Sequence, residues 1–252
     1  REVNMADLRH DICCAARILY RAGLSAGNAG HISISLADGR MLVNRFGPSF
    51  ATLSPRDILT VSFDGRVLEH APGVSPYVND TIALHGIIHR EVTHATAVVH
   101  THPPATTTWS TFRKLPEIYD QESCVLAGEI AIVDEDYQGL ASTEQRVLPL
   151  ARKLIEHRVA LFPNHGAVTT GPNVQAATVF MLLLEGMAAR NLALAATRGA
   201  GLVPQPVRPE YAQVAKAEIS LIPFLDPLWQ DLIARLQKTD PELFARSAQR
   251  VA

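Results

Sequence analysis

Three histidines stand at the ends of two apolar runs and together could hold a metal ion. His100 and His102 follow the run at 97–99, and because side chains alternate along a strand, both project from the same face. A second run at 159–162 leads to His165, which precedes a glycine. Three imidazoles from two strand ends make a divalent-metal site with positions left for water or substrate. The alternative is three unrelated histidines, two of which hydrogen-bond within a loop; the second loop with its own histidine favours the metal site.

The composition describes a globular protein that lacks the charge expected of a nucleic-acid or membrane binder. The chain has 252 residues, of which 47% are hydrophobic and 19% are charged, enough for one large α/β domain with a substantial core. The formal net charge is −2, which gives no electrostatic signature of binding to nucleic acid or to an anionic membrane. We therefore expect a small-molecule partner, no nucleic acid and no membrane.

The cysteines and the most apolar stretch of the chain indicate the compartment. The cysteines are odd in number and form no CxxC pair, which predicts buried thiols in a reducing compartment: Cys13, Cys14 and Cys124. The apolar stretch 179–196 is interrupted by Glu185, Arg190 and Asn191, which predicts a core helix rather than a membrane span. The first residues show no apolar signal segment. These features predict a cytoplasmic protein.

Hydrophobic periodicity predicts the elements that must position these histidines. Helical spacing predicts helices at 5–20, 79–91, 103–109, 143–157, 173–198, 209–221 and 227–238. Alternating or β-branched runs predict strands at 32–36, 41–43, 58–61, 67–68, 97–99, 130–133, 159–162 and 167–170. Asp-Gly turns at 38–39 and 64–65 predict two hairpins and therefore antiparallel pairing. We expect one α/β domain over 1–252, with a core at 5–200 and a C-terminal helical extension at 201–252 available for packing on a neighbouring subunit.

Several segments, in their order and spacing, resemble the class II aldolase/adducin family over about residues 5–200. The motifs that carry this resemblance are Gly30-His31-Ile32-Ser33-Ile34-Ser35, Met41-Leu42-Val43 with Gly47, Leu53-Ser54-Pro55 with Asp57, residues 79–89, His100-Thr101-His102 and Asn164-His165-Gly166. The resemblance implies an α/β/α fold with a mainly antiparallel sheet. It also implies one Zn²⁺ or Mn²⁺ per subunit, held by His100, His102 and His165. A cyclic homotetramer with sites near the subunit interfaces is implied as well.

The chain departs from the aldolases of this family at the substrate loops. Those aldolases carry a glutamate four residues before the position of His85, where it serves as metal ligand and general base, and here that position is Thr81. A threonine hydroxyl cannot act as a base at neutral pH. Asn79 and the aspartate after it replace the paired serines that bind a sugar phosphate, and Phe46 replaces the hydroxyl residue before Gly47. These departures disfavour a phosphosugar aldolase or epimerase.

The remaining site suits a planar anionic substrate that supplies its own oxygen ligands. It offers three neutral metal ligands, an aromatic wall at Phe46, and a cation, Arg45, that could bind a carboxylate not lost in the reaction. A hydroxy-substituted aromatic or pyridine carboxylate would chelate the metal through adjacent hydroxyl and carboxylate oxygens. The chain resembles the decarboxylase branch of the family, most of all the pyridine-dicarboxylate decarboxylases of pyridoxine breakdown. We predict a metal-dependent decarboxylase in which Arg45, Phe46, Gly47, Asn79 and Thr81 bind the substrate.

Loss of CO₂ from an aromatic ring requires protonation of the ring carbon that bears the carboxylate. His31 is the first candidate donor, since its ordinary pKa of about 6.5 allows proton transfer near neutrality. The alternative role for His31 is to anchor the substrate through a hydrogen bond. Tyr119 is a second candidate, near the position of a tyrosine acid in the family's aldolases. His85 and His89, one helical turn apart, could bind a second metal, but the resemblance implies a structural or supporting role for His85.

Three functions therefore remain open on the sequence. The leading prediction is a metal-dependent decarboxylase, a carbon–carbon lyase. The alternative is a class II aldolase or epimerase that acts on a sugar or hydroxy-carbonyl substrate. A catalytically silent, adducin-like interaction module is disfavoured because all three candidate metal ligands are present.

Overall fold

The core of the fold is an eight-stranded sheet, seen in a computed structural model that describes residues 4–25, 27–135, 139–220 and 224–245. The strands are β1 (His31–Ser35), β2 (Arg40–Asn44), β3 (Ile58–Ser62), β4 (Val67–Glu69), β5 (Ala97–Thr101), β6 (Ile130–Ile132), β7 (Val159–Phe162) and β8 (Gly166–Gly171). Their order across the sheet is β4-β3-β2-β1-β5-β8-β7-β6. Within the described residues only the β6–β7 pair is parallel, so the prediction of a mainly antiparallel sheet is confirmed.

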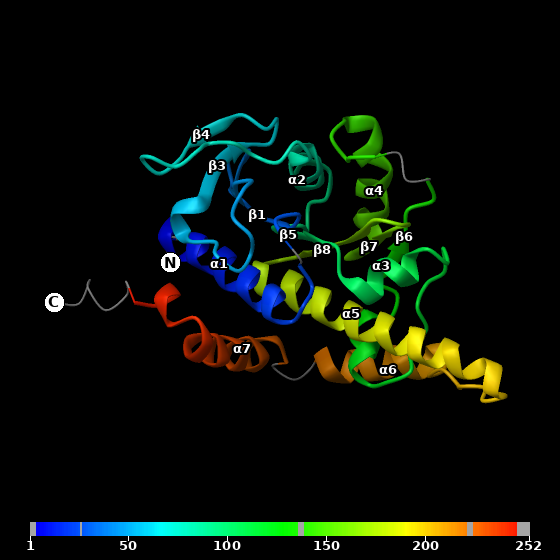
Figure 1. Cartoon of the computed structure of the whole chain (residues 1–252). Coiled ribbons are helices and arrows are strands. Elements are labelled where there is room, and N and C mark those ends of the chain that lie inside the picture. The colour runs from blue at the N-terminus through cyan, green and yellow to red at the C-terminus, as the bar shows by residue number, and fades with distance from the viewer. Residues whose placement is uncertain (1–3, 26, 136–138, 221–223, 246–252) are drawn as a thin grey trace.

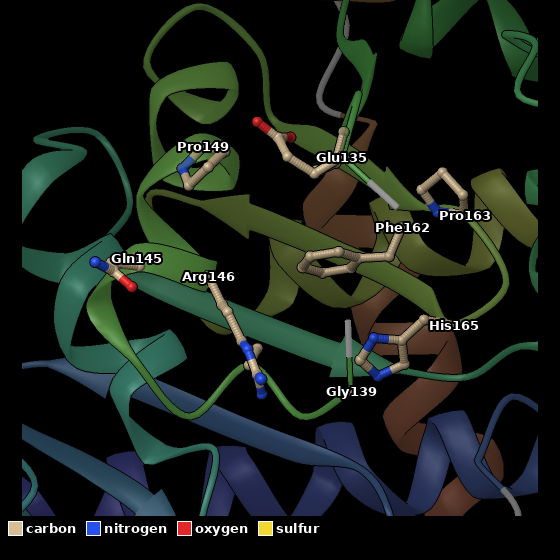
Figure 2. Close-up of a pocket in the computed structure, with 10 residues that line it drawn as sticks. Glu135, Gly139, Gln145, Arg146, Pro149, Phe162, Pro163 and His165 are labelled. Atoms are coloured by element: carbon tan, nitrogen blue, oxygen red, sulfur yellow. The ribbon is translucent and has the colours of Figure 1, made fainter. Parts of the chain in front are cut away.

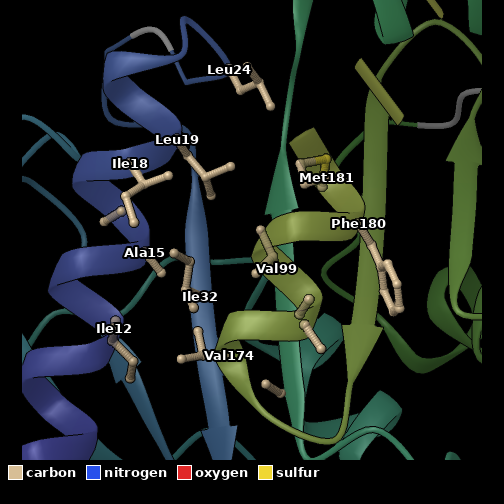
Figure 3. Packing of buried hydrophobic residues seen from close by; sticks show 14 of the residues in the cluster. Ile12, Ala15, Ile18, Leu19, Leu24, Ile32, Val99, Val174, Phe180 and Met181 are labelled. Atoms are coloured by element: carbon tan, nitrogen blue, oxygen red, sulfur yellow. The ribbon is translucent and has the colours of Figure 1, made fainter. Parts of the chain in front are cut away.

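Helices cover both faces of this sheet (Figure 1). They are α1 (Met5–Arg21), α2 (Ile82–Glu91), α3 (Pro104–Ser110), α4 (Glu144–Glu156), α5 (Val174–Thr197), α6 (Pro209–Ser220) and α7 (Leu225–Thr239). α1 and α5 pack on one face, where their apolar side chains meet Ile32 of β1 and Val99 of β5 (Figure 3). α2 and α4 cover the other face, where they bury Val98 and Val168. The alternation of Val98 and Val99 between two cores follows from the two-residue period of a strand, and the α/β/α prediction is confirmed.

One predicted helix begins later than its periodicity suggests. The spacing predicts a helix from residue 79, but α2 begins at Ile82. The side-chain oxygen of Asn79 accepts a hydrogen bond from the backbone N–H of Thr81 at 2.9 Å, which holds the preceding residues in a turn. Such local side-chain-to-backbone bonds compete with helix formation. The turn matters for the site because it directs Thr81 toward β1.

The apolar helix α5 is the central helix of the fold. By length and composition alone, Val174–Ala200 could cross a membrane. Its buried side chains instead pack against β5, β8 and α1. The carboxylate of Glu185, in the middle of α5, accepts hydrogen bonds from the backbone N–H groups of Ala105 and Thr106 at the start of α3. The part of α5 that makes these contacts is a core helix, as the sequence predicts.

The C-terminal extension packs on its own chain. α7 contacts α1 and α5, and Trp229 and Leu236 belong to the same buried cluster as the apolar face of α1. Asp240 is buried and forms ion pairs with Arg17 at 2.6 Å and with Arg21 at 3.1 Å. α7 therefore uses part of its apolar face within its own chain. Packing of the extension on a neighbouring subunit stays a prediction.

Candidate metal centre and active site

The three predicted metal ligands lie together at one edge of the sheet. His100 is on β5, His102 follows its last residue, and His165 lies in the turn between β7 and β8. β5 pairs with β8 through Thr101 and Ala167, and this register carries the turn to the end of β5. One ring nitrogen from each histidine lies within 4.8 Å of the others. The structure therefore brings together the triad that the sequence predicts.

The turn that carries His165 requires unusual backbone at two positions. Asn164 has a φ of 62°, in the left-handed region that asparagine tolerates better than most residues. A Cβ at Gly166 would lie 2.5 Å from the backbone oxygen of Thr101, so only glycine allows β8 to approach β5 this closely. The Asn-His-Gly sequence is therefore the local means by which His165 reaches His100.

The spacing and protonation of the triad fit a metal ion. The Nε2 atoms of His100 and His102 are 3.2 Å apart. Two imidazole nitrogens bound to one tetrahedral zinc, each at about 2.0–2.1 Å, lie about 3.3 Å apart. The Nδ1–H of His100 donates to the backbone oxygen of Ala167 at 2.9 Å, which leaves Nε2 with its lone pair toward the other rings. Burial lowers the pKa of His165 to about 4 and that of His100 well below its ordinary range, so both rings are neutral near pH 7.

His31 lies directly beside the triad. It is opposite His100 in the antiparallel β1–β5 pair, and the two ring centroids are 4.8 Å apart. The Oγ1 of Thr81 lies 3.0 Å from the Nε2 of His31, and the same hydroxyl lies 2.7 Å from the Oδ1 of Asn79. The structure thus brings His31 to the triad and Thr81, with Asn79, to His31, although these segments lie about 50 residues apart in the sequence.

The loop of Arg45, Phe46 and Gly47 is held by other contacts. The Nε of Arg45 donates to the carboxylate of Asp57 at 2.7 Å. The ring of Phe46 packs edge-on against Tyr77 with centroids 5.7 Å apart, and Gly47 has a φ of 122°. Within the described residues, these contacts join the loop to the turn before β3 and to the segment that precedes α2, not to the triad itself. Substrate binding by the loop stays a prediction.

Tyr119 lies in a different part of the same chain. Its hydroxyl donates to the carboxylate of Glu117, and it lines a cavity with Trp109, Asn191 and Arg198. None of the described residues that line this cavity belongs to the histidine triad. Within one chain the structure therefore does not bring Tyr119 to the metal centre, and its predicted role as an acid would require a second subunit.

A cavity beside His165 presents a cation that the sequence reasoning missed. The lining of this cavity includes Glu135, Arg146 and Phe162 as well as His165 (Figure 2). The Phe162 ring contacts both His100 and His165, with centroids 6.0 and 5.2 Å apart, so the cavity adjoins the triad. Arg146 is on the first turn of α4 and donates to the backbone oxygen of Leu140 at 2.9 Å. No local pattern marks Arg146, since charged residues are common on an exposed helix face.

Comparison with protein families identifies the class. Residues 10–192 match the class II aldolase and adducin N-terminal domain. The chain belongs to this family, which agrees with the fold and with the histidine triad.

Particular relatives include decarboxylases and aldolases. A 4-hydroxy-3-prenylphenylpyruvate oxygenase/4-hydroxy-3-prenylbenzoate synthase of Streptomyces roseochromogenus subsp. oscitans is 31% identical over 65% of this chain and 58% of its own length. The decarboxylase NovR of Streptomyces niveus is 31% identical over 56% of this chain and 52% of its own. The chain thus spans little more than half the length of these relatives. A solved L-fuculose-1-phosphate aldolase of Thermus thermophilus is 27% identical over 79% of this chain and 99% of that chain, with a TM-score of 0.67.

Proposed function

We propose that this protein is a metal-dependent decarboxylase of a hydroxy-substituted aromatic or pyridine carboxylate. Its family includes decarboxylases and aldolases, so a carbon–carbon lyase is the coarser description. The observation that carries the finer proposal is Thr81 beside His31, next to three neutral histidine ligands. A hydroxyl at this position cannot remove a proton from carbon, whereas decarboxylation adds a proton to carbon and needs no strong base.

The triad is the place for the divalent metal. His100, His102 and His165 would hold Zn²⁺ or Mn²⁺ through one ring nitrogen each, with the remaining positions open to substrate. When bound, the metal supplies Lewis-acid polarisation of the substrate oxygens. The phenyl ring of Phe162, which contacts two of the triad rings, covers one side of the centre.

The residues around the triad supply orientation and a proton. We assign to the Nε2 of His31 the transfer of a proton to the substrate ring carbon, because this ring lies beside His100. As the new C–H bond forms, the ring carbon loses its bond to the carboxylate. CO₂ departs, and the electron pair of the broken bond restores the aromatic ring. Asn79 and Thr81 would orient the substrate next to His31.

Two arginines are candidates for binding a second carboxylate. The sequence favours Arg45, but this guanidinium already pairs with Asp57. Arg146 lines the cavity next to His165. We assign the second carboxylate to Arg146, with Arg45 as the alternative. The value of kcat/KM for a dicarboxylate relative to its monocarboxylate analogue is expected to fall in Arg146→Ala more than in Arg45→Ala, while Arg152→Ala on the same helix leaves it unchanged. The opposite ranking of Arg45 and Arg146 would return the role to Arg45.

The assembly and its compartment are further parts of the proposal. A homotetramer with sites near the subunit interfaces would allow Tyr119 of one chain to approach the triad of another. Such an enzyme would act on a small molecule in the cytoplasm. Light scattering on the purified protein measures the number of chains directly. A monomer at working concentrations would remove Tyr119 from the site.

The second candidate is an aldolase that acts on a hydroxy-carbonyl substrate. It is favoured by the Thermus aldolase, which this chain covers over 99% of its length, against 52% for the Streptomyces decarboxylase. The two functions differ in the bond that breaks and in the need for a base. Thr81 disfavours the aldolase but does not affect the family assignment.

One screen separates the two candidates. Hydroxy-substituted benzoates, phthalates and pyridine dicarboxylates are tested for CO₂ release with Zn²⁺ or Mn²⁺, in parallel with aldol cleavage of ketose and ketose-phosphate substrates. We expect CO₂ release that depends on His165 and is absent in His165→Ala. His70→Ala is the matched control, because His70 is exposed and outside the site. Aldol cleavage without CO₂ release would overturn the proposal in favour of the aldolase.

A further inference from the structure

A buried row of polar side chains lies behind His31, on the side away from the substrate loops. Ser33 follows His31 by two residues on β1, so both project from the same face. His85 and His89 are four residues apart on α2 and therefore share one face of that helix. All four side chains are buried, with exposed fractions of 8% or less. The packing of α2 on the sheet thus places four polar groups in one dry row.

The inner end of this row has a defined hydrogen-bond direction. The Nδ1 of His89 lies 2.8 Å from the backbone oxygen of Ala95, and because a carbonyl only accepts, Nδ1 carries the hydrogen. A neutral His89 ring then has a lone pair at Nε2, which lies 2.7 Å from the hydroxyl oxygen of Ser33. Ser33 has one hydrogen and donates it there. Its oxygen therefore accepts from the Nδ1–H of His85 at 2.5 Å.

The same direction continues to the metal centre. With its hydrogen on Nδ1, a neutral His85 ring has a lone pair at Nε2, which lies 2.7 Å from the Nδ1 of His31. His31 must donate this bond, so its hydrogen is on Nδ1 and its lone pair is on Nε2. The Nε2 atom lies 3.0 Å from the hydroxyl oxygen of Thr81. Consecutive hydrogen bonds thus connect the Ala95 carbonyl to His31 in one orientation.

We propose that Ser33, His85 and His89 are positioning residues that hold His31 in the Nδ1–H tautomer, with Nε2 as a hydrogen-bond acceptor toward the substrate. Burial supports the neutral form of the inner ring, since it lowers the pKa of His89 to about 4. The role of this tautomer in catalysis rests on the proposed function. The assignment of the tautomer does not, since it follows from the hydrogen bond that the Ala95 carbonyl accepts from His89.

The outer end of the row identifies a property of the substrate. The Thr81 hydroxyl has one hydrogen but two acceptors, the Nε2 of His31 at 3.0 Å and the Oδ1 of Asn79 at 2.7 Å. One of these two acceptors is therefore left without a hydrogen-bond donor. A substrate hydroxyl bound beside His31 would supply it, which selects hydroxy-substituted acids over acids without a hydroxyl. His31 then begins the reaction as an acceptor, receives the hydroxyl proton and returns it to the ring carbon.

The tautomer is measured without any substrate. The Zn²⁺-loaded enzyme is labelled with ¹⁵N-histidine, and two-bond nitrogen–proton correlations identify which ring nitrogen carries hydrogen. We expect hydrogen on Nδ1 for His31, His85 and His89 in the wild type, and a second Nε2–H form of His31 in Ser33→Ala. Ser35→Ala is the matched control, because it removes the same atom from the same strand outside the row. Hydrogen on Nε2 of wild-type His31, or unchanged tautomers in Ser33→Ala, would overturn the proposal.

A kinetic measurement tests the consequence for the reaction. With the substrate found by the screen, Ser33→Ala is expected to lower kcat about tenfold with a smaller change in KM, while Ser35→Ala leaves both unchanged. His89→Phe keeps the ring volume, removes the inner anchor, and is expected to act in the same direction. An unchanged kcat in both variants would remove the positioning role. A screen that shows no decarboxylation would count against the proposed function alone, since the tautomer measurement is independent of it.

Discussion

Acidification provides a quantitative test of the buried histidine row. His89 is 8% exposed, and burial lowers its pKa in the folded protein to about 4, against about 6.5 in an unfolded chain. Below pH 6.5 the unfolded chain takes up a proton that folded His89 does not. The contribution of buried, neutral His89 to the free energy of unfolding is therefore fully present above about pH 6.5 and is lost as the pH falls toward 4. Linkage gives a loss of about 2 kcal/mol at pH 5 and about 3 kcal/mol at pH 4 and below.

The assay compares urea unfolding at pH 7.5 and pH 5.0, at one protein concentration and in the presence of a chelator. The wild-type free energy of unfolding falls between these pH values because several buried histidines titrate together. In His89→Phe this fall is expected to be smaller by about 2 kcal/mol, since the variant has no proton to bind at this position. In His70→Ala, which removes an exposed histidine, the free energy of unfolding is expected to fall by as much as in the wild type. Equal falls in the wild type and His89→Phe would refute the buried, neutral state assigned to His89.

Three further changes test the centre and the helix that supports it. His165→Ala is expected to reduce bound Zn²⁺ to background in equilibrium dialysis while the circular dichroism spectrum is retained, because the ligand lies in a turn; full occupancy would show that the ligand set is wrong. Thr81→Glu adds an anionic group beside His31 and is expected to tighten metal binding and slow decarboxylation. No change in either measurement would show that this side chain does not face the metal. Gly86→Ala places a Cβ 1.9 Å from the backbone oxygen of Phe63, so urea unfolding should show a loss of about 3 kcal/mol despite the better helix propensity of alanine. A variant as stable as the wild type would show that α2 can move away from this contact.

The sequence by itself predicted the elements and the histidine triad that could hold a metal. Strand and helix periods are local properties, so the alternation at the end of β5 predicts that His100 and His102 share a face. The Asn-His-Gly turn similarly marks His165 as a residue at a strand end. The family motifs then identified the class of the protein, and residues 10–192 match it.

Only the tertiary structure decided which groups surround that triad. The register of β1 against β5 places His31 opposite His100, and the packing of α2 on the sheet brings His85 and His89 to Ser33. These contacts join segments that are distant in the sequence, and no local period encodes their register.

The same dependence on packing between distant segments explains two features of the structure that the sequence did not predict. Arg146 reaches the cavity beside His165 because α4 follows the edge strand β6, which places it next to β7. α7 returns to α1 because an apolar helix face packs on the nearest uncovered apolar surface, here within its own chain. Sequence patterns show that a helix face is apolar or that a side chain is charged. Packing among distant segments decides which surface covers that face and which groups surround that side chain.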